Sequence, residues 1–211
     1  MNYAIREVFW TLQGEGVHAG TPAVFVRFAG CNVWSGREQD RAGAISRGVC
    51  AAWCDTEFRV AGGLGRLSVE GVVAEVVRPA LDWGLEAPGI VVCTGGEPSL
   101  QLNAPLVEAL RWHGFAVHVE TNGSRALPEV DWITLSPKPP MPVVLTRADE
   151  LKCVWPDVDP EPFQGLVPKG RTFLQPRDDG DPERVRATAD YVLNNPGLRL
   201  SIQTHKIIGL P

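Results

Sequence analysis

The decapeptide GIVVCTGGEP, residues 89–98, indicates the class of fold. Its first half is almost wholly apolar, as expected of a strand that is covered on both faces. Its second half is a glycine turn, Gly95-Gly96-Glu97-Pro98, that leads into a helix predicted from about Leu100 to His113. A buried strand, a short turn and a helix form the repeating unit of a parallel α/β sheet.

The same alternation extends along the chain in both directions. Before the decapeptide, two strands flank a glycine-rich connection, TLQGEGVHAGTP, and after it strands and turns follow one another to the end. The predicted strands cover residues 4–10, 23–28, 89–94, 115–120, 131–136, 150–155, 171–175 and 198–203. Parallel strands need right-handed crossovers, so the expected fold is α/β, with either an open sheet or a partial barrel.

Two further helices have clear signals. Valines at three- and four-residue steps predict a helix from Ser68 to Trp83, with Ser68 as its N-cap. Pro79 falls inside this pattern and is expected to kink or end the helix nearby. Asp181, an N-cap followed by a proline, predicts a helix that runs to about Asn194.

Two connections are long. Residues 35–48 are polar and lack a clear period, so we predict a surface excursion with a short helix from Glu38 to Ile45. The proline-rich residues 156–170 are predicted to be a surface loop.

Polar residues stand just after the ends of the predicted strands, where parallel β/α folds build their binding face. They are Thr94, Glu97, Glu120, Asn122, Ser136, Lys138, Gln175 and Gln203. Each alone is an ordinary turn former or helix cap, but their repetition at successive strand ends predicts a site. Arg27 lies in an otherwise apolar strand and points either to solvent or into a site for an anion.

Three cysteines, Cys31, Cys50 and Cys54, share one segment, with eighteen residues between the first two and three between the last two. Three thiolates can hold iron or zinc, and on a four-iron cluster they would leave one iron open to a small molecule. Structural zinc completed by a histidine, or simply buried thiols, is the plain alternative. Cys93 and Cys153 lie in apolar strands and are predicted to be core residues.

Size and composition further restrict the kind of protein that this chain can be. A chain of 211 residues with 44% apolar residues suits one domain with a full core, and a net charge of −5 argues against a nucleic-acid partner. We expect no secretory signal and no membrane span. Five cysteines without export features argue against a disulfide framework and favour a reducing cytoplasm.

Several short motifs stand in order along the chain: FWTLQGEG, PAVFVRFAGCN, WCDT, VCTGGEPSLQ, ETNG, SPK, ELK, FLQP and a terminal QTHK before the final proline. Together they resemble the radical S-adenosylmethionine superfamily and, within it, the 7-carboxy-7-deazaguanine synthase family. The resemblance covers nearly the whole length. A lone GGEP turn would be weak, whereas the full ordered set is specific.

The resemblance implies one radical SAM domain over residues 1–211, an incomplete parallel β/α barrel with a loop insertion at about 32–49, and a homodimer. It implies a 4Fe–4S cluster, S-adenosylmethionine, Mg²⁺ and a reductant protein such as flavodoxin. The implied reaction converts 6-carboxy-5,6,7,8-tetrahydropterin to 7-carboxy-7-deazaguanine with loss of ammonia, in the biosynthesis of queuosine-type bases. The cofactor does the hard chemistry, while the protein positions it and excludes water.

The resemblance also assigns residues. Cys31, Cys50 and Cys54 match the cluster ligands, and Thr56 matches the Mg²⁺ position. Contacts of S-adenosylmethionine match Trp53, Cys54, Asp55, Gly96, Ser136, Pro137, Lys138, Gln175, Pro176, Arg177 and Asp178. Contacts of the pterin match Leu12, Gln13, Gly14, Arg27, Thr94 and Pro211.

Two features of the sequence need a structural account. Members of the superfamily usually have three and then two residues between the cluster cysteines. The resembled family tolerates an expanded first gap, so the second gap, of three residues, is the more important departure. The final proline lies at a chain end, where segments are usually frayed. We expect burial of Ile207, Ile208 and Leu210 to hold this tail against the site, with His205 beside it.

Two other functions share part of this pattern. An activating enzyme for a glycyl-radical partner would use the same cluster chemistry, but it needs an open groove for a protein loop. A zinc-stabilised binding protein without catalysis is the alternative from another class.

Overall fold

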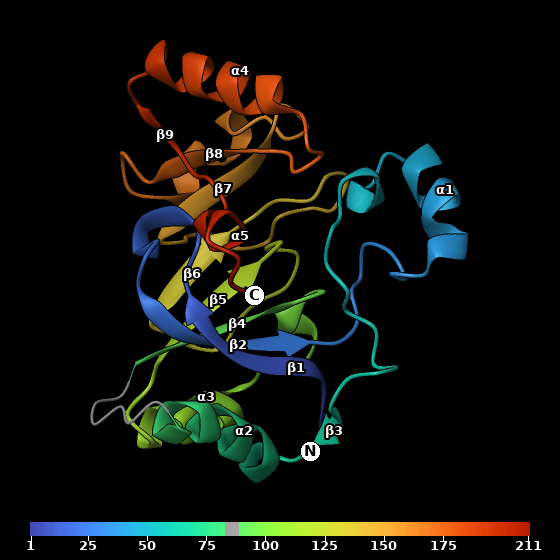
Figure 1. The fold of residues 1–211 in the computed structure, drawn as a ribbon, viewed down its shortest axis with the longest axis vertical. Helices are drawn as coiled ribbons and strands as arrows, with labels where there is room; N and C mark the ends of the chain where they lie inside the picture. Colours follow the sequence, from blue (N-terminus) through green and yellow to red (C-terminus); the bar gives the residue numbers. More distant parts are fainter. Residues whose placement is uncertain (83–88) are drawn as a thin grey trace.

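The structure, a computed structural model, describes residues 1–82 and 89–211. A sheet of nine strands runs through this part of the molecule in the order β3-β1-β2-β4-β5-β6-β7-β8-β9 (Figure 1). The strands are β1 (Tyr3–Leu12), β2 (Pro22–Phe28), β3 (Gly65–Leu67), β4 (Ile90–Gly95), β5 (Ala116–Thr121), β6 (Trp132–Leu135), β7 (Glu150–Trp155), β8 (Thr172–Pro176) and β9 (Leu198–Leu200).

Along the part of the sheet ordered β2-β4-β5-β6-β7-β8-β9, neighbouring strands pair in parallel, and β1 pairs antiparallel with both β2 and β3. The two outer strands, β3 and β9, do not pair with each other, so the sheet is open and not a closed barrel. The predicted α/β class is therefore confirmed. The short edge strand β3 was not predicted, because three residues carry too little periodicity to be recognised.

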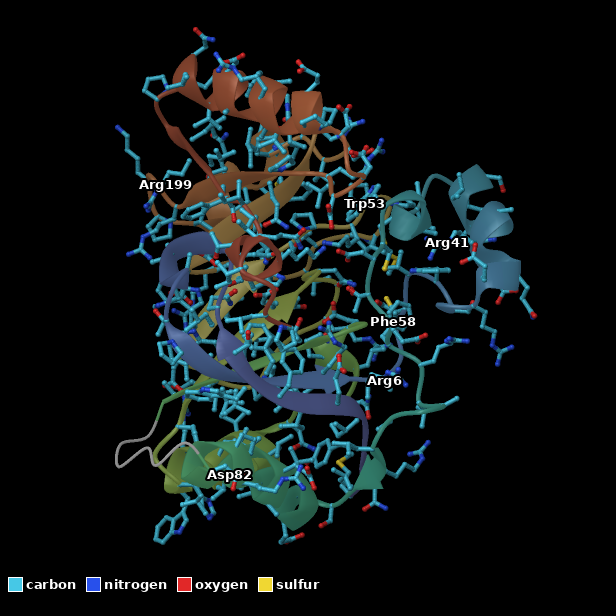
Figure 2. All side chains as sticks on the ribbon, in the orientation of Figure 1. Arg6, Arg41, Trp53, Phe58, Asp82 and Arg199 are labelled. Carbon is cyan, nitrogen blue, oxygen red and sulfur yellow. The ribbon has the colours of Figure 1, made fainter. Side chains whose placement is uncertain are left out.

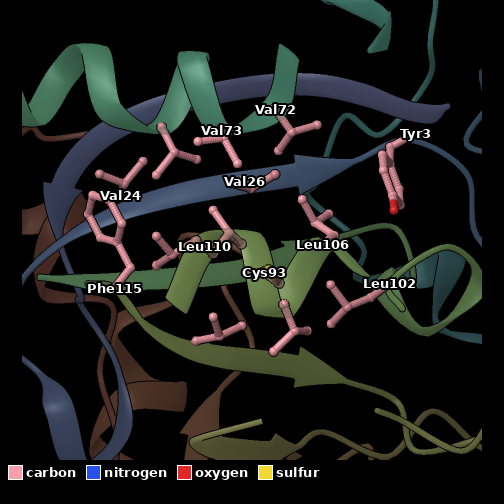
Figure 3. Close-up of a cluster of buried hydrophobic side chains, with 14 of the residues drawn as sticks. Tyr3, Val24, Val26, Val72, Val73, Cys93, Leu102, Leu106, Leu110 and Phe115 are labelled. Carbon is pink, nitrogen blue, oxygen red and sulfur yellow. The ribbon is translucent and has the colours of Figure 1, made fainter. Parts of the chain in front are cut away.

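The main helices are α2 (Val69–Asp82), α3 (Ala104–Trp112) and α4 (Pro182–Leu193). Helices α2 and α3 cover the half of the sheet that contains β1, β2, β4 and β5, and α4 lies at the β8–β9 end (Figure 1). The larger core fills the space between that first half of the sheet and its helices. Val26, Cys93 and Leu106 are fully buried there (Figure 3).

Two smaller cores lie elsewhere. One contains Leu151, Cys153 and Leu174 between β6, β7, β8 and the loop before β8. The other contains Trp34, Ala44, Cys50, Ala51 and Phe58 and lies under the excursion between β2 and β3. The predicted short helix of this excursion is confirmed as α1 (Glu38–Ser46), which projects from the side of the molecule (Figure 1). Cys93 and Cys153 are fully buried, as predicted.

Some boundaries differ from the prediction. The helix expected from Leu100 starts at Ala104, because Asn103 caps it by accepting a hydrogen bond from Leu106 N, and residues Pro98–Leu100 form the separate turn η3. Helix α2 continues through Pro79 to Asp82, so the proline lies in its last turn, and Trp83 lies outside the described residues.

The C-terminal part also differs. The last strand ends at Leu200 and not at Gln203, and a short helix, α5 (Thr204–Ile207), follows it. Residues 156–170 contain the turn η4 (Glu161–Leu166) within the predicted loop. In the described ranges, no helix has the length and apolar character needed to cross a membrane.

Candidate active site

A cavity of about 560 Å³ opens at the carboxyl ends of the parallel strands. All the polar residues predicted from the strand ends line it: Thr94, Glu97, Glu120, Asn122, Ser136, Lys138, Gln175 and Gln203. They meet because parallel strands end at the same edge of a sheet, although more than one hundred residues separate the first from the last. The residues predicted from the strand ends therefore lie together around one cavity.

The same cavity is lined by nearly all the residues that the family resemblance singled out. They are Leu12, Gln13, Arg27, Cys31, Cys50, Trp53, Cys54, Asp55, Thr56, Thr94, Gly96, Ser136, Lys138, Gln175, Pro176, Arg177, Asp178 and Pro211. Gly14 and Pro137 do not line it. Gly14 instead packs against the C-terminal tail, since a Cβ atom at position 14 would lie 1.9 Å from His205 Nδ1.

The three cysteines of the excursion lie on one wall of the cavity. Cys50 opens the short turn η2 (Cys50–Ala52), and Cys54 follows it. Cys31 Sγ accepts a hydrogen bond from Val33 N at 3.4 Å. Asn32, beside Cys31, accepts from Asn122 Nδ2 at 3.0 Å and so ties the segment to the end of β5.

The donor set fits an iron–sulfur cluster. Burial raises the pKa of the Cys31 thiol, and it raises that of Cys50 to about 12, with the Lys138 ammonium acting in the opposite direction. Such thiols become thiolates when a metal supplies the compensating positive charge. In the part of the chain that the structure describes, no three His, Cys, Asp or Glu side chains are arranged to hold a single metal ion. A cluster spreads its ligands over several iron atoms.

The turn after β4 packs directly against the first cysteine. A Cβ atom at Gly96 would lie 2.1 Å from Gly30 O and 3.0 Å from Cys31 Cβ. The next residue, Glu97, is buried and accepts hydrogen bonds from Thr121 Oγ1 at 2.7 Å and Asn122 N at 2.8 Å. The GGEP turn thus joins the cysteine segment to the end of β5.

Lys152 forms a buried ion-pair network at the centre of the cavity. Its ammonium donates to Glu120 Oε2 at 3.0 Å and to Glu15 Oε2, and the Lys152 side chain is 6% exposed. Burial opposes ionisation of Glu15, but the charge and hydrogen bond of Lys152 outweigh it and lower the pKa of Glu15 to about 2. The two glutamates raise the pKa of Lys152 against the effect of its burial. Lys152 therefore joins Glu15 of the glycine-rich loop to Glu120 at the end of β5.

Arg27 faces the cavity from β2. Its Nε donates to Glu7 Oε1 at 2.7 Å, and its guanidinium lies 5.6 Å from the centre of the Phe9 ring. The Arg27 side chain is 21% exposed and Glu7 is 47% exposed, so this pair is accessible from the cavity. Of the two orientations predicted for Arg27, the structure has the one toward a site.

The C-terminal tail covers one side of the cavity, but it is held differently from our expectation. Ile207 and Ile208 are 72% and 57% exposed, so burial of the apolar tail residues was a wrong prediction. Polar contacts hold the tail: Thr204 donates to Gly14 O through N at 3.1 Å and Oγ1 at 3.0 Å, and Thr11 Oγ1 donates to Pro211 O at 2.9 Å. The tail is too short to form a core of its own, but β1 and the loop after it offer it both a hydrogen-bond acceptor and a donor.

Lys206 adds a further link. Its ammonium lies 2.6 Å from Asp55 Oδ2 and 2.5 Å from Asp178 Oδ2. It therefore bridges the residue after Cys54 and the end of β8. Burial lowers the pKa of the neighbouring His205, so its imidazole is neutral at pH 7.

Glu15, Lys152 and Lys206 were not recognised as site residues from the sequence. A lysine within a mostly apolar predicted strand was the available signal for Lys152, since a buried cation needs partners. For Glu15 and Lys206, the sequence shows only a loop carboxylate and a tail lysine. Their partners lie far away in the chain.

An open α/β sheet that gathers three thiols, a glycine turn and the polar ends of its parallel strands around one cavity defines an enzyme built to hold a thiol-ligated cofactor. No protein-family model matches the chain. Curated relatives do match it over its full length. The chain is 45% identical to 7-carboxy-7-deazaguanine synthase of Burkholderia multivorans and 46% identical to that of Caulobacter vibrioides, with 100% of both chains covered in each case.

A solved structure agrees with this relationship. QueE from Escherichia coli superposes with a TM-score of 0.70 at 29% identity, covering 96% of this chain and 94% of that one. The chain therefore belongs to the 7-carboxy-7-deazaguanine synthase family, whose members are radical S-adenosylmethionine lyases. The comparisons do not favour a glycyl-radical activating enzyme.

We predict that Lys152→Met destabilises the protein by about 3–5 kcal/mol at pH 7, because it leaves two buried carboxylates without their cation. Urea unfolding followed by tryptophan fluorescence measures the change. Lys169→Met, at an exposed lysine, is the matched control and should change stability by less than about 0.5 kcal/mol.

The pH dependence of stability gives a second test of the Lys152→Met variant. In the wild type the pKa of Glu15 is lowered to about 2, so its stabilising contribution is present above the unfolded pKa of about 4.3 and is lost as pH falls toward 2. Without Lys152, burial raises that pKa and only the hydrogen bonds of Gln203 and Gln175 oppose it, so the pKa of Glu15 should rise and acidification from pH 7 to pH 5 should narrow the stability difference between Lys152→Met and the wild type. If Lys152→Met had the same urea midpoint as the wild type at both pH 7 and pH 5, that result would contradict the ion-pair network.

Proposed function

We propose that this chain is a 7-carboxy-7-deazaguanine synthase. It converts 6-carboxy-5,6,7,8-tetrahydropterin to 7-carboxy-7-deazaguanine and releases ammonia. The observation that carries the proposal is the full-length similarity to curated synthases in a chain whose cavity gathers the cysteines and the strand-end residues. We further propose that the open sheet is the incomplete β/α barrel of radical SAM enzymes, in one domain with an insertion at 32–49.

In this proposal, Cys31, Cys50 and Cys54 hold a 4Fe–4S cluster. When bound, the cluster and S-adenosylmethionine supply the one-electron chemistry that starts the reaction. Contacts of S-adenosylmethionine are assigned to Trp53, Cys54, Asp55, Gly96, Ser136, Pro137, Lys138, Gln175, Pro176, Arg177 and Asp178. Lys138 is well suited to this role, because its ammonium lies 5.3 Å from the Trp53 ring and hydrogen-bonds to Ser136 O at 2.9 Å, which fixes its direction.

The pterin is assigned to the opposite side of the cavity, at Leu12, Gln13, Gly14, Arg27, Thr94 and Pro211. Arg27 can exchange its accessible partner Glu7 for the substrate carboxylate, which a guanidinium binds through two parallel hydrogen bonds. The carboxylates of Glu15 and Glu120 offer acceptors for the N–H groups of a pterin. The neutral His205 can accept a proton. The tail excludes water from this side.

Three finer statements belong to the proposal. Mg²⁺ binds Thr56 and the substrate carboxylate. A reductant protein such as flavodoxin approaches over a hollow of about 220 Å³ that reaches Cys54 from outside, and the enzyme works as a homodimer. A reducing cytoplasm agrees with all five cysteines being free.

The cluster assignment is tested with anaerobically reconstituted protein. Alanine at Cys31, Cys50 or Cys54 should remove most of the iron and all cleavage of S-adenosylmethionine, because each thiolate is a ligand. Cys93→Ala and Cys153→Ala are the matched controls and should keep both. Iron and sulfide analysis, together with an assay of S-adenosylmethionine cleavage, measures these outcomes. A full complement of iron in Cys50→Ala would contradict the assignment of Cys50 as a ligand.

The Mg²⁺ assignment predicts that the metal accelerates turnover without changing the iron content. Thr56→Ala should weaken the dependence on Mg²⁺ and raise the KM for the pterin, because the hydroxyl is the oxygen ligand that the protein supplies. Thr56→Ser keeps a hydroxyl and should behave like the wild type. Turnover that is indifferent to Mg²⁺ in the presence of a chelator would contradict the assignment.

The tail assignment predicts that removal of Leu210 and Pro211, or addition of a short C-terminal tag, leaves the cluster and S-adenosylmethionine binding intact. The KM for the pterin should rise about tenfold or more, equivalent to at least one lost hydrogen bond. Thr11→Val, which removes the donor to Pro211 O, should show a smaller rise. Ile208→Ser, at an exposed side chain, is the control. Unchanged kinetics after truncation would assign the tail to packing alone.

A further inference from the structure

Helix α1 has few apolar contacts with the rest of the molecule. It has nine residues, of which Ala44 is the buried one. A helix of this length is marginal in water on its own, so it needs tertiary contacts to persist. It nevertheless stands next to the segment that contains Cys50 and Cys54 (Figure 1). The contacts that fix it therefore bear on those two cysteines.

One side chain of α1, Arg41, makes the polar contacts between the helix and the cysteine turn. Arg41 Nη1 donates to Ala51 O at 2.5 Å and to Cys54 O at 3.3 Å. These carbonyls belong to the residue directly after Cys50 and to Cys54 itself. Arg41 lies between α1 and the turn that carries Trp53 (Figure 2).

The orientation of the guanidinium is fixed from two further sides. It lies 4.7 Å from the centre of the ring of Trp34, a residue that is 6% exposed. Its Nε donates to Glu38 Oε2 at 2.8 Å, one turn earlier on the same helix, and Glu38 itself is 82% exposed. A planar guanidinium that stacks on a buried ring has little freedom to reorient. The two carbonyls are thus held at a fixed separation.

The spacing of the cysteines suggests what the contact between Arg41 and the cysteine turn does. Three residues lie between Cys50 and Cys54, so the turn between them is longer and has more conformations than a turn with a two-residue gap. We propose that Arg41 is a positioning residue for the cluster ligands. It clasps both ends of the Cys50–Cys54 turn and adds a positive charge at the backbone of that turn. The inference rests on the cluster assignment in the proposed function.

Two consequences follow from this geometry. Without Arg41 the turn loses its clamp, so Cys50 and Cys54 present their thiols less often in the ligand arrangement. The positive charge also favours the reduced, more negative form of a cluster, because hydrogen bonds and nearby charge set cluster potentials. Loss of the charge should therefore lower the reduction potential.

The test compares Arg41→Met and Arg41→Lys with two controls in the full-length, anaerobically reconstituted protein. Arg47→Met removes an exposed arginine from the end of the same helix, and Glu38→Gln removes the ion pair but keeps Arg41. The readouts are the rate of iron uptake, the reduction potential, the electron paramagnetic resonance spectrum of the reduced cluster and amide exchange in residues 50–56.

Arg41→Met should take up iron about tenfold more slowly, in the range found when outer-shell partners of metal ligands are lost. Its amide exchange at 50–56 should be faster, its potential lower, and its kcat reduced with an unchanged KM for the pterin. Arg41→Lys keeps the charge but not the planar fork, so it should restore the potential but not the uptake rate. Arg47→Met should match the wild type, and Glu38→Gln, whose amide oxygen can still accept from Arg41 Nε, should change these readouts less than Arg41→Met does.

The proposal is overturned if Arg41→Met behaves like Arg47→Met in iron uptake and amide exchange while both are folded by circular dichroism. Failure of the proposed function looks different. A wild type that holds a cluster but does not convert the pterin would remove that function and leave the Arg41 comparison readable. A wild type that binds no cluster would remove both.

Discussion

The buried ammonium of Lys152 is the interaction on which the architecture of the cavity depends. A buried charge without partners costs several kcal/mol, so the Lys152 ammonium holds the carboxylates of Glu15 and Glu120 beside it. Glu120 lies at the end of β5, whereas Glu15 belongs to the glycine-rich loop between β1 and β2. The ion pair therefore draws this loop across from the antiparallel end of the sheet to β7. Gln175 on β8 adds to it by donating to Glu15 Oε1 at 3.0 Å.

The position of that loop in turn determines where the chain ends. With the loop held over the strand ends, the carbonyl of Gly14 is available to Thr204, and Thr11 can reach the carbonyl of Pro211. Lys206 then joins the tail to the segment after Cys54 and to the end of β8. Ion pairs and hydrogen bonds hold the tail in place, whereas apolar packing holds the helices against the sheet. This is why the tail can expose its isoleucines and still cover the cavity.

The cysteine excursion between β2 and β3 is stabilised differently from the sheet. It has a small core of its own, and its helix contributes one buried alanine to that core. The hydrogen bond from Asn122 to Asn32 ties the excursion to the end of β5, and within the excursion Arg41 ties its helix to the cysteine turn. A long first gap between cysteines costs little, since the entropy of loop closure grows slowly with length. The longer second gap is the demanding one, and it is the gap that Arg41 spans.

The sequence by itself determined the α/β class, eight of the nine strands and the edge of the sheet at which a site would form. Apolar runs, glycine turns and polar strand ends are local signals, and parallel strands bring their ends together whatever the rest of the chain does. Only the tertiary structure decided that the sheet stays open, that Glu15 and Lys152 share a charge network, and that hydrogen bonds hold the tail. These contacts join residues 137 or more positions apart, as Glu15 and Lys152 or Thr11 and Pro211. No local pattern encodes such a pairing, because each partner looks like an ordinary loop or strand residue until the fold places it beside the other.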